Sequence, residues 1–221
     1  LMVDPGGYWP AITLLINGLP GLFINSLYLF ILLYPFTKPI TAHFILYIYI
    51  YNMNYTKRIE NIKGDIKLQR YQKIPYNIIQ TFKTRDVPIT MWDNVYKWHL
   101  LNPEYNYLFF DDNDIYKYIN DCNFNKLNIS KNDFKKALLK VKPGAGKADL
   151  FRLLIVYNIG GCYFDIDTTP LFPLKKFVNS NDEVVSGIGY RGDFHQWGLI
   201  YIKEHPFIKK ALEIAVQNVI N

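Results

Sequence analysis

The sequence predicts an α/β fold with a largely parallel sheet and flanking helices, preceded by an apolar membrane segment. Three observations support this. Short apolar runs of strand length alternate with helical patterns over residues 74–221, and nearly all of the charge lies after residue 55. In addition, one of the apolar runs leads directly into two aspartates, Asp165 and Asp167. Alternating strands and helices favour a parallel sheet, in which ligands bind beyond the carboxyl ends of the strands.

The first 55 residues are almost free of charge: Asp4, Lys38 and His43 are the only residues among them that can carry a charge near neutral pH. Residues 11–34 are long enough to cross a bilayer, which needs about 20 apolar residues, and a second apolar run covers residues 40–51. No basic segment precedes them, so a cleaved signal peptide is not favoured. We therefore predict a membrane anchor over residues 1–55, as one span with an interfacial piece or as a hairpin of two spans. A buried core helix is the alternative.

Residues 56–73 are predicted to form a basic juxtamembrane linker. The whole chain carries a formal net charge of +6 and has a sequence pI near 9.1. Six basic residues follow the apolar part closely: Lys57, Arg58, Lys63, Lys67, Arg70 and Lys73. Such a cluster beside a membrane segment is typical of contact with anionic lipid headgroups, and a plain solvated linker is the alternative. Nucleic acid is not an expected partner, because the cluster has no nucleic-acid-binding fold signature.

The remainder, residues 74–221, is long enough for one domain with its own core. Its first half is expected to contain, in order, a strand at 77–82, a helix at 89–101, a strand at 105–110 and helices at 114–121 and 130–141. Pro88 precedes the first of these helices and Pro103 ends it. Ser130 and Asp133 form an N-cap pair that begins the last one.

The second half is expected to contain a helix at 146–158, strands at 162–166, 183–187 and 197–202, and a helix at 206–220. Gly160 is a plausible C-terminal stop for the first of these helices. Asp149 and Arg152 lie three residues apart on that otherwise apolar helix and so share a face. A charged pair on a mostly buried helix favours a ligand site. A solvated surface ion pair is the alternative.

The strand at 162–166 carries the central prediction for function. Alternate strand residues share a side, so Asp165 and Asp167 would point together while Ile166 packs inward. Two carboxylates at a strand end suit Mg²⁺ or Mn²⁺ bound to a diphosphate, and such a cation stabilises the charge on a departing phosphate. The spacing alone is weak evidence, because a second D-x-D occurs at 112–114 in a polar helix start. The D-x-D at 165–167 differs from the one at 112–114 because a buried strand precedes it. Solvated loop carboxylates are the alternative.

A longer pattern resembles a known group of enzymes. Its parts are, in order, Ile74-Pro75, Ile79-Gln80-Thr81-Phe82, Trp92, Asn102-Pro103-Glu104-Tyr105, Asp111-Asp112, Lys147-Ala148-Asp149, Arg152, Tyr157 and Gly160-Gly161-Cys162-Tyr163-Phe164-Asp165-Ile166-Asp167. The pattern is similar to that of glycosyltransferases with a DXD sugar-binding region. These include the initiation-specific α-1,6-mannosyltransferases, the inositol phosphoceramide mannosyltransferases and capsular polysaccharide synthesis relatives. The resemblance covers residues 74 to about 208.

The resemblance implies a Rossmann-like GT-A fold, a nucleotide-diphosphate sugar as donor substrate and a glycan or glycolipid as acceptor. It also implies Mn²⁺ or Mg²⁺, held by Asp165 and Asp167, which are the expected catalytic residues. The residues expected to bind the sugar donor are Gln80, Asp149, Arg152, Gly161, Tyr163 and Asp165. Gly160-Gly161 would form a turn or clear space beside the carboxylates. Asp193 and His195 lie in a stretch similar to the acceptor-side loop of the family and are weaker candidates.

Two other functions stay open at this point. Asp165-Ile166-Asp167-Thr168-Thr169 also fits the D-x-D-x-T signature of haloacid dehalogenase-type phosphatases, in which the first Asp is the nucleophile. That signature normally opens its domain, whereas here an α/β pattern of about 90 residues precedes it. A non-catalytic, degenerate sugar-binding module is the second alternative. It stays open because family members usually continue beyond the position of Asn221, which predicts a domain truncated at its C-terminus.

The predicted localisation is membrane-bound, in a Golgi-type or a cytoplasmic membrane. One span and the positive-inside rule would put the catalytic part in the cytosol. A Golgi-type relative would have it in the lumen, so the side stays open.

Overall fold

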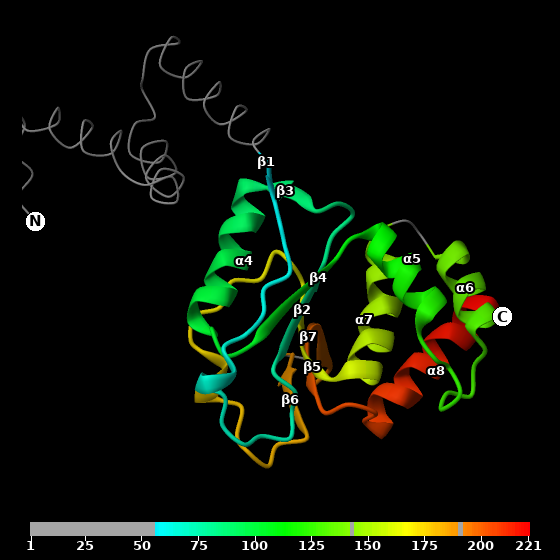
Figure 1. Cartoon of the computed structure of the whole chain (residues 1–221). Helices are drawn as coiled ribbons and strands as arrows, with labels where there is room; N and C mark the ends of the chain where they lie inside the picture. Colours follow the sequence, from blue (N-terminus) through cyan, green and yellow to red (C-terminus); the bar gives the residue numbers. More distant parts are fainter. Residues whose placement is uncertain (1–55, 142–143, 190–191) are drawn as a thin grey trace, which may run out of the picture. The chain divides into compact units, whose positions relative to one another are not determined.

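The computed structural model describes residues 56–141, 144–189 and 192–221 (Figure 1). The predicted anchor over residues 1–55 lies outside this part of the chain. Among the described residues, no helix combines the length and the apolarity that a membrane span requires.

A five-stranded sheet forms the centre of the fold. Its strand order is β4 (Asn106–Phe110), β2 (Asn77–Thr81), β5 (Gly161–Phe164), β7 (Phe194–Tyr201) and β6 (Val184–Ile188). All five strands were predicted, with ends that differ by up to three residues. β2 pairs in parallel with both β4 and β5, whereas β7 pairs antiparallel with β5 and with β6.

The predicted largely parallel sheet is therefore wrong, and the sheet is mixed. The reason lies after β5, where the chain forms no crossover helix among the described residues and continues to β6 through a loop and a single 3₁₀ turn. β6 and β7 then follow each other as a hairpin, and two strands joined by a short loop pair antiparallel. The hairpin places β7 between β6 and β5.

The helices confirm the predicted order and lie on both faces of the sheet. They are α4 (Ile89–Leu101), α5 (Asp112–Asp121), α6 (Lys131–Lys140), α7 (Ala145–Ile159) and α8 (Pro206–Ile220). Figure 1 shows α4 on one side of the sheet and α5 to α8 on the other. Ser130 and Asp133 form the predicted cap pair of α6, each side chain accepting a hydrogen bond from the backbone N–H of the other.

Two hydrophobic clusters fill the spaces on either side of the sheet. Alternate residues of one strand enter different clusters, as the pleat requires: Ile79 and Tyr163 pack toward α7, whereas Ile78 and Phe164 pack toward α4. The indole of Trp98 on α4 stacks on the Phe164 ring, with 4.1 Å between ring centroids. The strand that leads to Asp165 is thus held on both faces.

Residues 56–73, the predicted linker, pack against this unit. β1 (Thr56–Arg58) pairs antiparallel with β3 (Asp86–Pro88), and Ile59 is buried. Ile62 forms an isolated bridge with Tyr107 on β4. A Cβ on Gly64 would lie 2.5 Å from the Glu104 carbonyl oxygen, so the chain runs in close contact here. The predicted boundary at residue 74 falls inside the folded unit, because strand pairing, the buried Ile59 and the Ile62 bridge attach the segment.

Candidate functional site

The Asp165 turn, residues 165–169, follows β5 at the carboxyl end of the sheet's parallel strands. β5 ends at Phe164, so Asp165 and Asp167 lie in a turn and not in the strand as predicted. The Thr168 backbone N–H donates to the Asp165 carbonyl oxygen over 3.0 Å, and the Thr168 hydroxyl donates to the same oxygen over 2.6 Å. Ile166 is buried as predicted, and Asp167 is exposed. The prediction that strand alternation points Asp165 and Asp167 to one side therefore does not apply, because both residues follow the end of the strand.

The Asp165 carboxylate has two neighbours on its Oδ1 atom. The Tyr163 hydroxyl donates to it over 3.0 Å, and Arg152 Nη2 lies 3.3 Å away. Burial raises the pKa of Asp165 above its ordinary value, and the Asp167 and Asp149 carboxylates raise it further. The Arg152 guanidinium and the Tyr163 hydroxyl lower the pKa and so oppose this rise. The three aspartates therefore lie close enough to influence one another, and a cation would relieve their repulsion.

Arg152 joins the two sides of this cluster. Its side chain is only 7% exposed, and its Nη2 atom lies 2.6 Å from Asp149 Oδ1. Its Nη1 atom donates to the Gln196 backbone carbonyl over 2.6 Å, and the guanidinium lies over the Tyr163 ring, 5.1 Å from its centroid. The alternative of a solvated ion pair therefore does not describe Arg152. Asp149, by contrast, is 53% exposed and can reach a ligand.

Gln80 and Tyr163 lie beneath the turn. Gln80 is fully buried; its Nε2 atom donates to the Asp165 carbonyl oxygen over 3.1 Å, and its Oε1 atom accepts from the Tyr107 hydroxyl over 2.8 Å. The buried Tyr163 hydroxyl lies 3.2 Å from the Thr81 hydroxyl. Both predicted site residues therefore reach the cluster from inside the protein, where they fix the backbone and the carboxylate of Asp165.

Gly161 is not brought to the carboxylates. It begins β5, at the end of the strand opposite to Asp165, and has a φ of 109°. A Cβ at this position would lie 2.6 Å from the Asn77 carbonyl oxygen. The glycine permits close packing between β5 and β2 and does not clear space at the predicted metal site.

The first residues of β7 lie beside the Asp165 turn. The Asp165 backbone N–H donates to the Trp197 carbonyl oxygen over 2.9 Å. His195 is partly exposed and its ring centroid is 5.2 Å from that of Trp197, whereas Asp193 is exposed in the preceding loop. The two acceptor-side candidates therefore belong to the segment that flanks the turn. No hydrogen bond or ion pair joins them to its carboxylates in the described part of the chain.

Two residues of α4 hold the turn from the other face of the sheet, and the sequence did not identify them as part of the site. Asn94 Nδ2 donates to the Asp167 carbonyl oxygen over 3.3 Å, and Asn94 Oδ1 accepts from the Thr169 hydroxyl. Trp98 Nε1 donates to the Thr168 carbonyl oxygen over 3.2 Å. Asn94 and Trp98 are four residues apart and therefore share a face of α4. This pairing of a polar side chain with Trp on one helix face is the signal that could have identified them from the sequence.

The carboxylates fit a cation that takes most of its ligands from elsewhere. Over the described ranges, no three His, Cys, Asp or Glu side chains form a metal-binding group. Asp165 and Asp167 offer hard oxygen atoms of the kind that Mg²⁺ and Mn²⁺ bind. The donor set is thus compatible with a cation shared with a diphosphate.

Comparison with known proteins confirms the resemblance predicted from the sequence. Residues 88–184 match the family described as glycosyltransferase sugar-binding region containing DXD motif. The chain is 28% identical over 148 residues to the mannosyl phosphorylinositol ceramide synthase SUR1 of Saccharomyces cerevisiae, which covers 64% of this chain and 35% of that protein. It is 26% identical over 164 residues to the initiation-specific alpha-1,6-mannosyltransferase of Candida albicans, covering 62% of this chain and 41% of the relative.

These relatives are considerably longer than the chain, which spans 35% and 41% of their lengths. Among solved structures, the PaToxG glycosyltransferase has a similar fold, with a TM-score of 0.51 and 20% identity over 66% of this chain and 61% of that one. The fold is therefore a mixed α/β, glycosyltransferase-like fold. The family match and the named relatives support a transferase, and they favour it over the phosphatase alternative.

Proposed function

We propose that this domain is the sugar-donor-binding part of a hexosyltransferase, with mannose as the first candidate sugar. It would move the sugar from a nucleotide diphosphate to a glycan or glycolipid acceptor. The observation that carries this proposal is the cluster of Asp149, Arg152 and Asp165 at the carboxyl end of β5, inside the region that matches the DXD family. A buried arginine between two carboxylates is a costly arrangement that suits a ligand site.

Asp165 and Asp167 would hold Mn²⁺ or Mg²⁺, whose other ligands would be diphosphate oxygens and water. When bound, such a cation supplies charge stabilisation for a departing diphosphate. The chain's own residues prepare the site. The Tyr163 hydroxyl and Arg152 fix one oxygen of Asp165, which leaves Oδ2 for the cation. Asp149 is exposed enough to accept hydrogen bonds from sugar hydroxyls, while Arg152 limits the negative charge that the diphosphate meets.

A screen of nucleotide sugars tests this proposal. We expect binding of at least one nucleotide-diphosphate sugar that strengthens when Mn²⁺ is added, followed by transfer of the sugar to water with release of the nucleotide diphosphate. Binding without turnover would instead support the degenerate sugar-binding module. The absence of Mn²⁺-dependent binding for every common nucleotide sugar would contradict both.

We also propose that residues 11–51 anchor the protein in a membrane, of the Golgi type or cytoplasmic. A chain shortened to begin at Thr56 should leave the membrane fraction and keep its affinity for the sugar donor. A chain beginning at Tyr71 should be markedly less stable, because it loses β1 and the buried Ile59, whose side chain alone contributes about 2 kcal/mol. Recovery of the full-length protein in the soluble fraction after a carbonate wash would contradict the anchor.

A further inference from the structure

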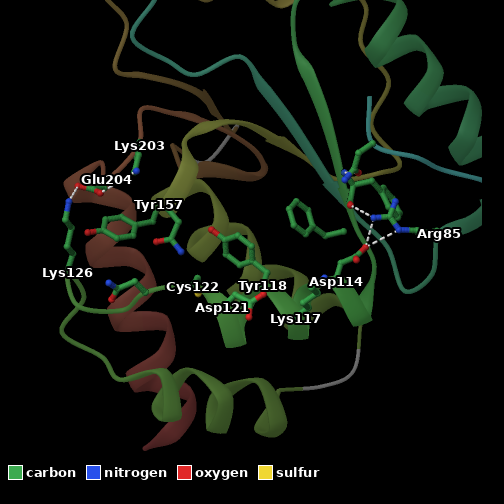
Figure 2. A pocket seen from close by; sticks show the side chains of 15 residues that line it. Arg85, Asp114, Lys117, Tyr118, Asp121, Cys122, Lys126, Tyr157, Lys203 and Glu204 are labelled. Atoms are coloured by element: carbon green, nitrogen blue, oxygen red, sulfur yellow. Dashed lines mark hydrogen bonds and ion pairs between the residues drawn. The ribbon is translucent and has the colours of Figure 1, made fainter. Parts of the chain in front are cut away.

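A cavity lies apart from the Asp165 turn. It has a volume of about 610 Å³ and extends along α5, bounded by the C-terminal turn of α7 and by the end of β4 (Figure 2). We call it the α5 cavity. Asp149, Arg152, Asp165 and Asp167 do not line it. Its volume falls in the range of about 300–1,000 Å³ that small-molecule sites occupy.

The two ends of the α5 cavity carry ion pairs, as Figure 2 shows. At one end Arg85 Nη2 lies 2.6 Å from Asp114 Oδ2, and the same guanidinium donates to the carbonyl oxygens of Ile59 and Phe109. At the other end Lys126 Nζ lies 2.6 Å from Glu204 Oε2. These charged groups already have partners within the protein, so a charged ligand would have to compete with them.

The middle of the α5 cavity is polar and aromatic. The rings of Phe110 and Tyr118 meet edge to face, with centroids 5.9 Å apart, and Tyr157 and Asn158 come from the last turn of α7. Among the described residues, Asn158 Nδ2 is buried without a hydrogen-bond acceptor in suitable geometry, although Tyr118 and Cys122 lie near it. A buried donor without a partner is costly, and an oxygen atom of a ligand would satisfy it once the side chains that enclose the amide move aside.

The charges around the α5 cavity nearly cancel. Four cationic side chains line it together with three carboxylates: Arg85, Lys117, Lys126 and Lys203 with Asp114, Asp121 and Glu204. Such a lining has no strong preference for an anion. It offers both donors and acceptors of hydrogen bonds, together with aromatic rings. A sugar presents hydroxyl groups that donate and accept, and C–H faces that pack on rings.

We propose that the α5 cavity binds a neutral oligosaccharide at a site separate from the sugar-donor site. Two or three sugar units of a glycan held here would raise the local concentration of the glycan at the enzyme. This role in catalysis rests on the proposed transferase function, whereas the binding itself does not.

The experiment uses the full chain and a linear α-1,6-linked mannotetraose, with binding followed by calorimetry. Asn158→Leu should weaken binding by about tenfold, because a buried hydrogen bond to the ligand is lost, and should leave the melting temperature unchanged or higher. Asn123→Ala, at the exposed rim of the α5 cavity, gives a second test should Asn158→Leu fold poorly. Asp165→Asn is the matched control and should bind the tetraose as the unmodified chain does.

Three results would overturn the proposal: no binding of the tetraose, binding that survives both changes in the α5 cavity, or binding that is lost in Asp165→Asn. Displacement of the tetraose by inorganic phosphate in the Asp165→Asn variant would also overturn it, because the cavity would then be an anion site. Binding of a nucleotide sugar in the presence of Mn²⁺ is measured separately. Its failure would contradict the proposed transferase and not the oligosaccharide site.

Discussion

The chain contains two D-x-D sequences with the same spacing and different structural roles. Asp112 and Asp114 lie in the first turn of α5, where Asp114 accepts from the Asp111 backbone N–H and pairs with Arg85. Asp165 and Asp167 follow a strand that is buried on both faces, and their turn is held by residues from α4, α7, β2 and β7. The D-x-D at 112–114 begins a helix, whereas the D-x-D at 165–167 presents carboxylates at the carboxyl end of the central strand β5.

The difference shows that surroundings, and not spacing, determine what two carboxylates can do. Asp114 has its negative charge met by the helix N-terminus and by Arg85, so little is left to attract a cation. Asp165 has a neighbouring arginine too, but Asp149 and Asp167 add negative charge around it. The second cluster is therefore the one to which we assign the proposed divalent ion.

The largest effect is expected for Asp167→Asn. This change removes an exposed carboxylate and leaves its backbone contact with Asn94 in place, so the fold should persist. Loss of a metal ligand should lower turnover by at least about 100-fold and abolish Mn²⁺-dependent binding of the sugar donor. Calorimetry with and without Mn²⁺ measures the binding.

Asp112→Asn is the matched control from the other D-x-D, and this variant should bind the sugar donor as the unmodified chain does. Equal losses of binding in the two variants would contradict the assignment of the metal to Asp165 and Asp167 alone.

Arg152→Lys comes next. Lysine cannot contact Asp149, Asp165 and the Gln196 carbonyl at once, because it lacks the planar fork of the guanidinium. We expect turnover to fall by about 100-fold if Arg152 stabilises charge on the diphosphate. Melting should also occur at a lower temperature, since the side chain is buried. A variant with normal kinetics and only a lower melting temperature would make Arg152 purely structural.

A smaller effect is expected for Asn94→Ala on α4. The Asn94 side chain hydrogen-bonds to the Asp167 carbonyl oxygen and to the Thr169 hydroxyl, so it would act by positioning the turn. Misplacement of Asp167 should lower turnover by about tenfold and raise the Mn²⁺ concentration needed for half-maximal activity. A shift in the Mn²⁺ requirement is the diagnostic readout, since a merely structural role would lower stability without it. Tyr96→Ala, an exposed change on the same helix, is the control.

Much of the fold could be predicted from the sequence because its signals are local. Pro88, the Ser130–Asp133 pair and Gly160 mark helix ends through interactions within a few residues, and the structure confirms all three. The direction of β7 was missed, because it depends on where the β6–β7 hairpin docks. The attachment of residues 56–73 was missed as well, since only Ile59 and Ile62 signal it.

The candidate site was predictable where its residues lie close in sequence. Asp149, Arg152 and Asp165 come from one helix–strand unit, and the structure brings them together as expected. Contacts across long separations were not predictable from local pattern: the family resemblance named Gln80 as a site residue, and Asn94 was not identified from the sequence. Gln80 meets the Asp165 backbone across 85 residues and Asn94 meets Asp167 across 73. The prediction that Gly161 lies beside the carboxylates was wrong for a related reason. Gly161 and Asp165 are close in sequence, but β5 lies between them and places them at opposite ends of the strand.

The smallest effect on turnover is expected for Asp114→Asn, which makes the same change as Asp167→Asn at the last residue of the other D-x-D. The change removes the carboxylate that lies 2.6 Å from Arg85, whose side chain is only 14% exposed, and weakens the capping box of α5. Unfolding should therefore become easier by about 2 kcal/mol, measured by urea denaturation. Turnover and Mn²⁺ dependence should stay unchanged, because no contact links Asp114 to the Asp165 turn among the described residues. A loss of Mn²⁺-dependent binding in this variant would show that the helix start takes part in the donor site after all.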